Sequence, residues 1–156
     1  MGSVMNPREF RELATILAAK EDSTSAELRT AVSRAYYAVY NVAVDFLQKI
    51  GVKHAGGWEA HRMIPEALRY GSDEELSGAA LELVDLRRMR WAADYDMQDR
   101  EVEDQRTVQK LAARAKQAIK KMDGCQDDPA RATLARGKIR GWAGSAEGAR
   151  KGFTVL

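Results

Sequence analysis

Four polar or aromatic side chains recur along one long helical stretch of the sequence. Arg34, Tyr37, Asn41 and Asp45 are spaced by three and four residues, which places them on one face of an α-helix. A solvated helix face more often carries Lys and Glu than this mixture, so the face has the groups that a binding site needs. Tyrosines beside an apolar stripe are also typical of core residues whose hydroxyl groups find a partner at the core boundary. Both interpretations stay open at this point.

A second group of reactive side chains surrounds Arg90. Arg90 follows Leu86 by four residues and precedes Ala93 by three, so its side chain is predicted to point along the core-facing stripe. An inward arginine needs a partner, because an unpaired buried charge is very costly. Asp94, one turn later, is the local candidate, and Asp45 and the tyrosines of the first stretch are the distant ones. A salt bridge that locks two helices together and a functional site both fit this pattern.

Helices must position these side chains, and the hydrophobic periodicity predicts five of them, over residues 6–20, 25–50, 58–68, 72–93 and 102–122. No period-two alternation indicates a strand. The predicted fold class is therefore all-α, an up-and-down bundle of four to five helices over residues 6–124. Residues 125–156 are predicted to be a flexible, basic, glycine-rich tail, and residues 1–5 a leader outside the bundle.

Composition excludes several classes of protein. The 156 residues include 31% charged and 45% hydrophobic residues, as expected for a soluble globular domain. The single cysteine, Cys125, rules out an internal disulfide and fits a reducing cytoplasm. No apolar run is long enough to span a membrane. Residues 125–156 carry six Lys and Arg against three Asp and Glu, whereas the body is nearly balanced, which disfavours a duplex-DNA binder that neutralises many phosphates.

Three blocks of the sequence carry a family resemblance. They are Ser33-Arg34-Ala35-Tyr36-Tyr37-Ala38-Val39-Tyr40, the loop Gly51-Val52-Lys53-His54, and the segment from Arg90 through Ala93-Asp94-Tyr95-Asp96. In this order they resemble the HEPN superfamily, in particular its small stand-alone bacterial and archaeal members. The resemblance implies a helical bundle, usually a homodimer with a cleft near its axis. It also implies a metal-independent ribonuclease with an Arg-x(4–6)-His motif, acting as a toxin with a nucleotidyltransferase antitoxin or in phage defence. Other relatives bind nucleotides or act as adaptors.

The chain departs from the catalytic motif of that family. Tyr95 stands where the motif histidine belongs, and a phenol with a reference pKa near 10 is a poor general base at neutral pH. Arg90 can supply positive charge to a phosphorane. His54, at the position of the family's loop histidine, can serve as the base only if the fold or a second subunit brings it close. The resemblance also makes Tyr95 the residue that a partner nucleotidyltransferase would modify. His61 has no counterpart in the motif and is not assigned a role.

Two functions compete on this evidence. The first is an RNA-directed protein with no cofactor, whose candidate catalytic residues are Arg90, Tyr95 and His54 and whose candidate binding residues are Arg34, Tyr37, Asn41, Asp45 and Asp94. The second is a non-catalytic helical dimer that binds a nucleotide or a partner protein. A metal-carboxylate bundle is disfavoured, since the sequence has no Glu-x-x-His pair.

Overall fold

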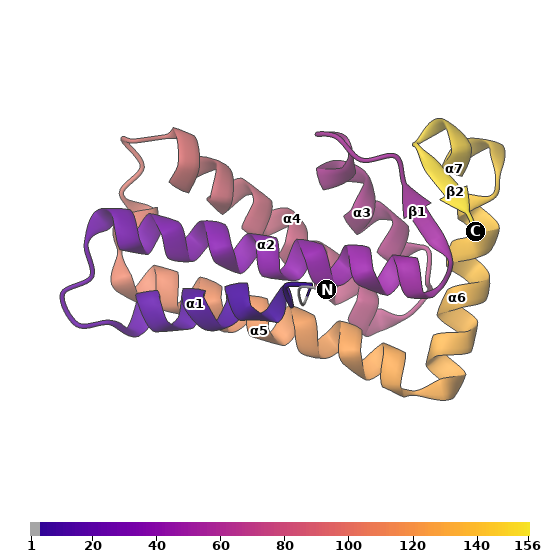
Figure 1. Ribbon diagram of the computed structural model, residues 1–156, viewed down its shortest axis with the longest axis horizontal. Helices are drawn as coiled ribbons and strands as arrows, with labels where there is room; N and C mark the ends of the chain where they lie inside the picture. The colour runs from indigo at the N-terminus through magenta and orange to yellow at the C-terminus, as the bar shows by residue number, and fades with distance from the viewer. Residues whose placement is uncertain (1–3) are drawn as a thin grey trace.

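The computed structural model describes residues 4–156, so Met1–Ser3 of the predicted leader lie outside the described residues. The described chain is almost entirely helical and is arranged as a bundle (Figure 1), which confirms the all-α prediction. No described helix is both long enough and apolar enough to cross a membrane. The elements in order are α1 (Arg8–Ala19), α2 (Ser25–Lys49), β1 (Val52–His54), α3 (Ala60–Arg69), α4 (Glu74–Tyr95), the 3-10 helix η1 (Glu101–Glu103), α5 (Gln105–Asp127), α6 (Pro129–Ala143), α7 (Ala146–Arg150) and β2 (Phe153–Val155).

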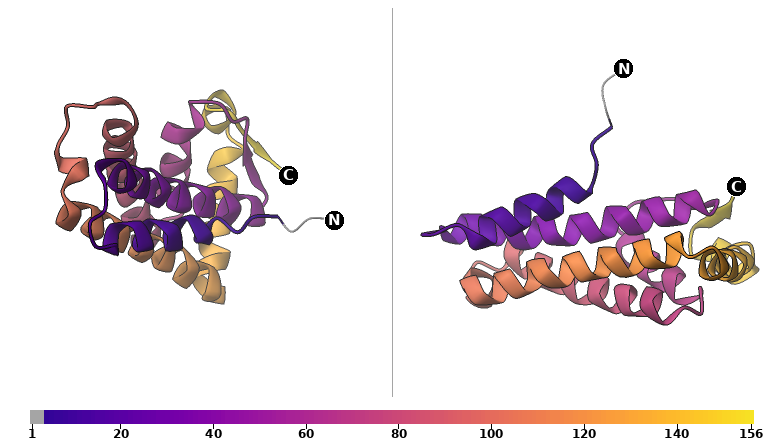
Figure 2. Two further views of the ribbon diagram at one scale, coloured as in Figure 1. Left: turned by 60° about the vertical axis from the view of Figure 1, so that its left-hand side comes forward. Right: turned by 90° about the horizontal axis from the view of Figure 1, so that it is seen from below.

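Helix α2 is the central element of the bundle. It starts at a capping box in which the Thr24 side chain accepts the Glu27 backbone N–H and the Glu27 carboxylate accepts the Thr24 N–H. It then packs against α1, α4 and α5, which run side by side with it in both views of Figure 2. Its buried side chains include nearly all of the predicted apolar stripe: Leu28, Val32, Ala35, Tyr36, Val39, Ala43, Phe46 and Leu47.

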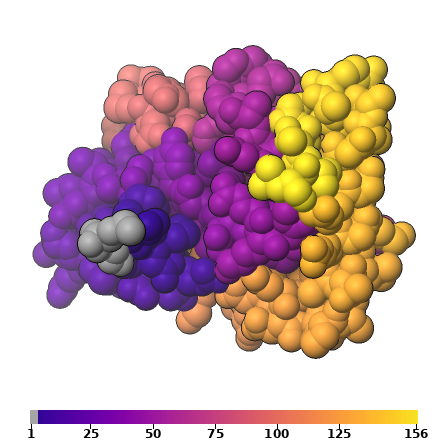
Figure 3. Space-filling view, turned by 45° about the vertical axis from the view of Figure 1, so that its right-hand side comes forward, coloured from indigo at the N-terminus to yellow at the C-terminus, as the bar shows by residue number. Residues whose placement is uncertain are grey.

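The segment after residue 124 is folded, and the prediction of a flexible tail there is wrong. Gly124 does not end α5, which continues to Asp127. Asp128 then caps α6, accepting the Ala130 and Arg131 N–H groups, with Pro129 in the first turn, where its missing N–H costs nothing. Helix α6 runs across the end of the bundle (Figure 1), and the C-terminal segment packs against the preceding helices in the space-filling view (Figure 3).

Contacts with distant residues fix this C-terminal segment in place. Arg131 donates to the Asp73 carboxylate at 2.8 and 2.9 Å, and Trp142 stacks on Tyr70 with ring centroids 4.2 Å apart. Gly148 is required, because an added Cβ would collide with the carbonyl oxygen of Trp142. At Gly148, the absence of a side chain therefore permits close packing and does not signal flexibility.

The small sheet formed by β1 and β2 has no counterpart among the sequence predictions. The two strands pair antiparallel, with Val52 opposite Val155 and His54 opposite Phe153. Each strand has only three residues, too few for a periodic pattern to be recognised. The sheet ties the end of the described chain to the loop that leads into α3.

A buried arginine joins α2 to the end of α4. The Arg29 side chain donates to the backbone carbonyl groups of Ala92, Ala93, Asp96 and Asp99 at 2.8–3.2 Å, and its Nε donates to Glu103 Oε1 at 2.8 Å. Only 8% of Arg29 is exposed. The guanidinium thus supplies donors to four carbonyl groups at the C-terminus of α4 and in the following turn. Two of them, those of Ala92 and Asp96, also accept a backbone N–H.

We predict that Arg29→Met destabilises the fold by about 3 kcal/mol or more, because it removes the hydrogen bonds of a buried guanidinium to Glu103 and to four backbone carbonyl groups. Urea unfolding measures the change. Arg100→Met is the matched control, since Arg100 pairs with the same Glu103 at 3.0 Å from an exposed position, and such a pair contributes about 1 kcal/mol or less. Equal losses of stability for the two variants would contradict this role of Arg29.

Candidate functional site

The two reactive blocks of the sequence meet where α4 packs on α2. The Arg90 Nη2 atom donates a hydrogen bond of 2.7 Å to the Tyr37 hydroxyl oxygen, and Arg90 Nε lies 3.4 Å from Asp94 Oδ2. The guanidinium carbon is 5.3 Å from the Tyr37 ring centroid and 5.6 Å from that of Tyr36, within cation–π range. The Arg90 side chain is 15% exposed. The structure therefore places Arg90 inward, with Asp94 and a tyrosine of α2 as its partners.

His61, to which the sequence assigned no role, joins this cluster from α3. Its Nδ1 lies 2.5 Å from the Tyr36 hydroxyl oxygen, and its ring stacks on Tyr40 with centroids 4.4 Å apart. Its Nε2 has no hydrogen-bond partner among the described residues. No local motif marks His61, because its contacts are with residues more than 20 positions earlier. The one signal that the sequence offers is the position of His61 on a short amphipathic helix.

Burial and the neighbouring cations set the protonation states of the cluster. Burial lowers the pKa of His61, and the positive charges of Arg90 and Arg87 lower it further, so its imidazole is neutral at pH 7. Burial raises the pKa of Tyr36 and of Tyr40, so both phenols keep their protons. Burial alone would lower the pKa of Arg90, but the hydrogen bond from Arg90 to Tyr37 and the Asp94 charge raise it above its usual value. Arg90 is therefore a permanent cation that lies between the Asp94 carboxylate and the neutral side chains of Tyr36 and His61.

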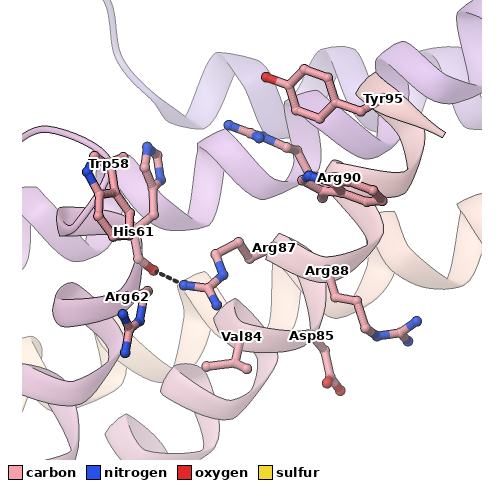
Figure 4. Close-up of a pocket in the computed structure, with 10 residues that line it drawn as sticks. Trp58, His61, Arg62, Val84, Asp85, Arg87, Arg88, Arg90 and Tyr95 are labelled. Atoms are coloured by element: carbon pink, nitrogen blue, oxygen red, sulfur yellow. Dashed lines mark hydrogen bonds between the residues drawn. The ribbon is translucent and has the colours of Figure 1, made fainter.

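A pocket of about 910 Å³ opens beside His61 and Arg90, between α3 and α4. Figure 4 shows Trp58 and His61 on its α3 side and Arg87, Arg90 and Tyr95 on its α4 side. The rim is aromatic, since Trp58 is 71%, Trp91 57% and Tyr95 63% exposed. The complete lining is Trp58, His61, Arg62, Val84, Asp85, Arg87, Arg88, Arg90, Trp91 and Tyr95. We call this the Arg90 pocket.

His54 does not line the Arg90 pocket. Its Nε2 lies 2.8 Å from the Lys151 carbonyl oxygen, and its Nδ1 accepts the Gly56 N–H at 3.0 Å. Its ring also packs against Phe153, with centroids 4.8 Å apart. Both ring nitrogens are thus engaged with the backbone in and beside the small sheet. Within this chain, His54 has a structural role, because it binds backbone groups. The histidine that lies beside Arg90 is His61 and not His54, which the sequence analysis had considered as the base.

Asn41 and Asp45 also lie outside the Arg90 pocket. Asn41 donates to the Tyr37 carbonyl oxygen at 2.8 Å, and Asp45 pairs with Lys49 at 3.0 Å. Both line a separate hollow of about 540 Å³ between α2 and the residues at the start of α1. Of the polar stripe predicted on α2, only the part nearest α4 reaches Arg90.

Arg34 supports the cluster from the opposite side. Its guanidinium carbon lies 5.1 Å from the Tyr37 ring centroid and 4.8 Å from that of Phe10. Ser33 Oγ links it to the site, because it lies 3.4 Å from Arg34 Nη2 and 3.4 Å from Asp94 Oδ2. Arg34 and Asp94 therefore help to position Tyr37 and Arg90 and do not line the Arg90 pocket themselves.

The chemistry open to this site is that of an anion-binding pocket with one neutral histidine. No group of three or more His, Cys, Asp and Glu side chains among residues 4–156 is arranged to hold a metal ion. The Arg90 guanidinium can bind a phosphate, the aromatic rim can stack on planar rings, and His61 Nε2 can accept or donate a proton.

We predict that lowering the pH below about 6.5 destabilises the fold through His61. Because the pKa of His61 is lowered in the folded state, the unfolded chain binds more protons between the two pKa values, and stability falls as the pH falls through this window. Urea unfolding at pH 7.5 and 5.0 measures the loss, and His61→Gln should reduce it. An NMR titration of the His61 ring with its midpoint at or above 6.5 would contradict this prediction.

Comparison with known proteins leaves the chain without a family assignment: no protein-family model, no curated protein and no solved structure matches it.

Proposed function

We propose that this chain is a HEPN-like protein that binds RNA in the Arg90 pocket and cleaves it through the RNA 2′-hydroxyl group. The observation that carries the proposal is the convergence of Arg90 and a neutral His61 in one open pocket with an aromatic rim. A toxin-like or defence role beside a nucleotidyltransferase partner follows from the resemblance of its sequence blocks to that superfamily.

Phosphate recognition is the first support for RNA as the ligand. Guanidinium groups bind phosphate oxygens in pairs of charge-assisted hydrogen bonds. Arg90 uses Nη2 for Tyr37, and its Nη1 makes no hydrogen bond to the described residues. Its Nε is buried without a hydrogen-bond partner, although the Asp94 carboxylate is 3.4 Å away. Because Nε is buried, the hydrogen-bonding capacity that Arg90 has left for an incoming anion is on Nη1 and on the second N–H of Nη2.

The rim of the Arg90 pocket supports a nucleic acid over a simple anion. Unstacked bases bind to exposed aromatic rings, and each base stacked in this way contributes about 1–3 kcal/mol. Trp91 and Tyr95 have ring centroids 6.1 Å apart on α4, and Trp58 lies across the pocket before α3. Duplex bases are already stacked, so this rim selects single-stranded segments.

His61 provides the base that Tyr95 cannot. A neutral imidazole has one N–H. In the tautomer in which Nδ1 carries it and donates to the Tyr36 hydroxyl oxygen, Nε2 has the free lone pair that takes the proton of a ribose 2′-hydroxyl. The 2′-oxygen then bonds to phosphorus, the bond from phosphorus to the 5′-oxygen breaks, and solvent returns a proton to that leaving oxygen. The Arg90 charge stabilises the phosphorane between these steps. The products are a 2′,3′-cyclic phosphate and a 5′-hydroxyl end.

Tyr95 fits a second part of the proposal, its modification by a partner enzyme. Its ring is exposed at the mouth of the pocket and lies 5.8 Å from the Arg90 guanidinium carbon. A nucleotidyl group on the Tyr95 hydroxyl would place a phosphate beside Arg90 and occupy the site. Modification of Tyr95 would therefore block the binding of RNA in the Arg90 pocket.

A non-catalytic dimer is the second candidate, favoured by one observation. The outer face of α4 exposes Leu81, Val84 and Trp91 to 62%, 46% and 57%, an unusual concentration of large apolar side chains on one helix. A second copy or a partner protein could cover this face. This candidate would be favoured if the purified protein sediments as a dimer and neither binds nor cleaves RNA.

We predict that His61→Asn lowers the rate of RNA cleavage by about 100-fold or more while RNA affinity changes little, because it removes a general base and leaves the cations. Arg90→Lys should weaken both binding and cleavage, since lysine cannot form the paired contact. A fluorescent single-stranded RNA with gel analysis of the cyclic-phosphate product gives both quantities, and His54→Asn is the matched control.

The same variants should be tested in cells by induced expression and growth. Growth arrest by the wild type that is relieved by His61→Asn is the expected outcome. Intact RNA after incubation with the purified wild type, together with harmless expression, would remove the ribonuclease proposal.

A further inference from the structure

We infer that the groove between α3 and α4 beyond the Arg90 pocket is a second, backbone-binding subsite, so that the ligand is a single-stranded RNA several nucleotides long. This inference rests on the proposed function and specifies its substrate. The groove is a hollow of about 600 Å³ that shares Arg62, Val84 and Arg87 with the Arg90 pocket and adds Arg69. We call this part the Arg69 groove.

The arginines of the Arg69 groove have no acidic partner. Within residues 4–156, no carboxylate lies within 4.0 Å of a nitrogen of Arg62, Arg69 or Arg87. Some other arginines of the bundle do have such partners, as Arg114 has Glu82 and Asp85. Unpaired cations gathered in one hollow create a positive potential that attracts an anionic ligand.

The carboxylates in and beside the groove do not cancel this charge. Glu66 lines the Arg69 groove, but it is bonded to Lys151, which follows α7 and does not line either hollow. Asp85 lines the Arg90 pocket, but its carboxylate lies 2.9 Å from Arg114 of α5, also outside both hollows. Each acid is thus ion-paired with a cation outside the two hollows, which also binds a second carboxylate, and no carboxylate pairs with the guanidinium groups of the groove.

The spacing of the arginines suits a chain of phosphates more than a single one. Arg62 and Arg69 are seven residues apart on α3, two turns on the same face and about 10 Å along the helix axis. Arg87 faces them from α4, where its Nη1 donates to the His61 carbonyl oxygen at 3.2 Å (Figure 4). That bond fixes Arg87 between the two hollows. A strand that enters at Arg90 would meet these cations at successive phosphates.

The two hollows differ in their aromatic content, which assigns each a different part of the strand. The exposed rings Trp58, Trp91 and Tyr95 surround the Arg90 pocket alone. The Arg69 groove contains one aromatic ring, Tyr70, and Trp142 stacks on it 4.2 Å away, covering one of its faces. Bases are therefore held in the Arg90 pocket, whereas the Arg69 groove binds the backbone and is indifferent to sequence.

Arg69→Gln tests this inference, because Arg69 is exposed and lines only the second hollow. With a labelled uridine 12-mer, the variant should bind about fivefold more weakly and show a salt dependence flatter by about 0.7 in the log–log slope, as expected when a single strand has one neutralised phosphate fewer. With the labelled dinucleotide UpU, it should bind as the wild type does. Arg106→Gln, an exposed arginine of α5 outside both hollows, is the matched control.

The outcomes separate this inference from the proposed function. If Arg69→Gln and Arg106→Gln have the same salt slope on the 12-mer while UpU binding still depends on Arg90, the subsite is absent and the proposed function stands. If the wild type binds neither RNA, both fall. Binding of a 12-residue glutamate peptide as tightly as the 12-mer would overturn the assignment to RNA, since the groove would then fit an acidic protein partner.

Discussion

The buried guanidinium of Arg29 determines where the reactive end of α4 lies. Five acceptors converge on it, and four of them are backbone carbonyl oxygens from the last turn of α4 and the turn that follows. A charge in this position is tolerable only because its donors are bound to these acceptors. These bonds hold the C-terminus of α4 against α2. They thereby fix the positions of the side chains in the last turns of α4, namely Arg90, Asp94 and Tyr95.

With α4 held in this position, the site is built from successive contacts between charged and neutral side chains. Arg34 and Phe10 support Tyr37 from one side, and Tyr37 in turn binds Arg90. Burial keeps the Tyr36 phenol and the His61 imidazole neutral, so Arg90 is the one charge of the inner cluster with donors still available. A preorganised cation that is already held by Tyr37 and Asp94 needs little rearrangement when an anion arrives.

The sequence predicted the bundle well because long amphipathic helices carry their own signal. The apolar stripe of α2 and the inward direction of Arg90 both follow from a period of 3.6 residues. Arg29 carries no such signal, since its partners are backbone groups more than 60 positions away, whose location depends on the whole fold. His61 was missed for a similar reason, and because the motif of the superfamily points to Tyr95 and His54 instead.

The C-terminal segment shows a different limit of prediction. A glycine provides the same composition signal whether it loosens a chain or permits close packing, as Gly148 does against Trp142. Charge was also ambiguous, because Arg131 and Arg140 are basic residues that bind the bundle, the first through Asp73 and the second through the Ile50 carbonyl oxygen at 3.0 Å. Only the three-dimensional partners distinguish a docked helix from a tail.

The pairing of β1 with β2 has a consequence for the order in which the protein is made. Strand β1 and the loop to Trp58 lead directly into α3, yet their partner, Phe153–Val155, is about 100 residues further along the chain. During translation the bundle of α1, α2, α4 and α5 can assemble while this loop still lacks its hydrogen-bonding strand. Residues 153–155 must therefore be synthesised before the loop that leads into α3 gains its hydrogen-bonding strand.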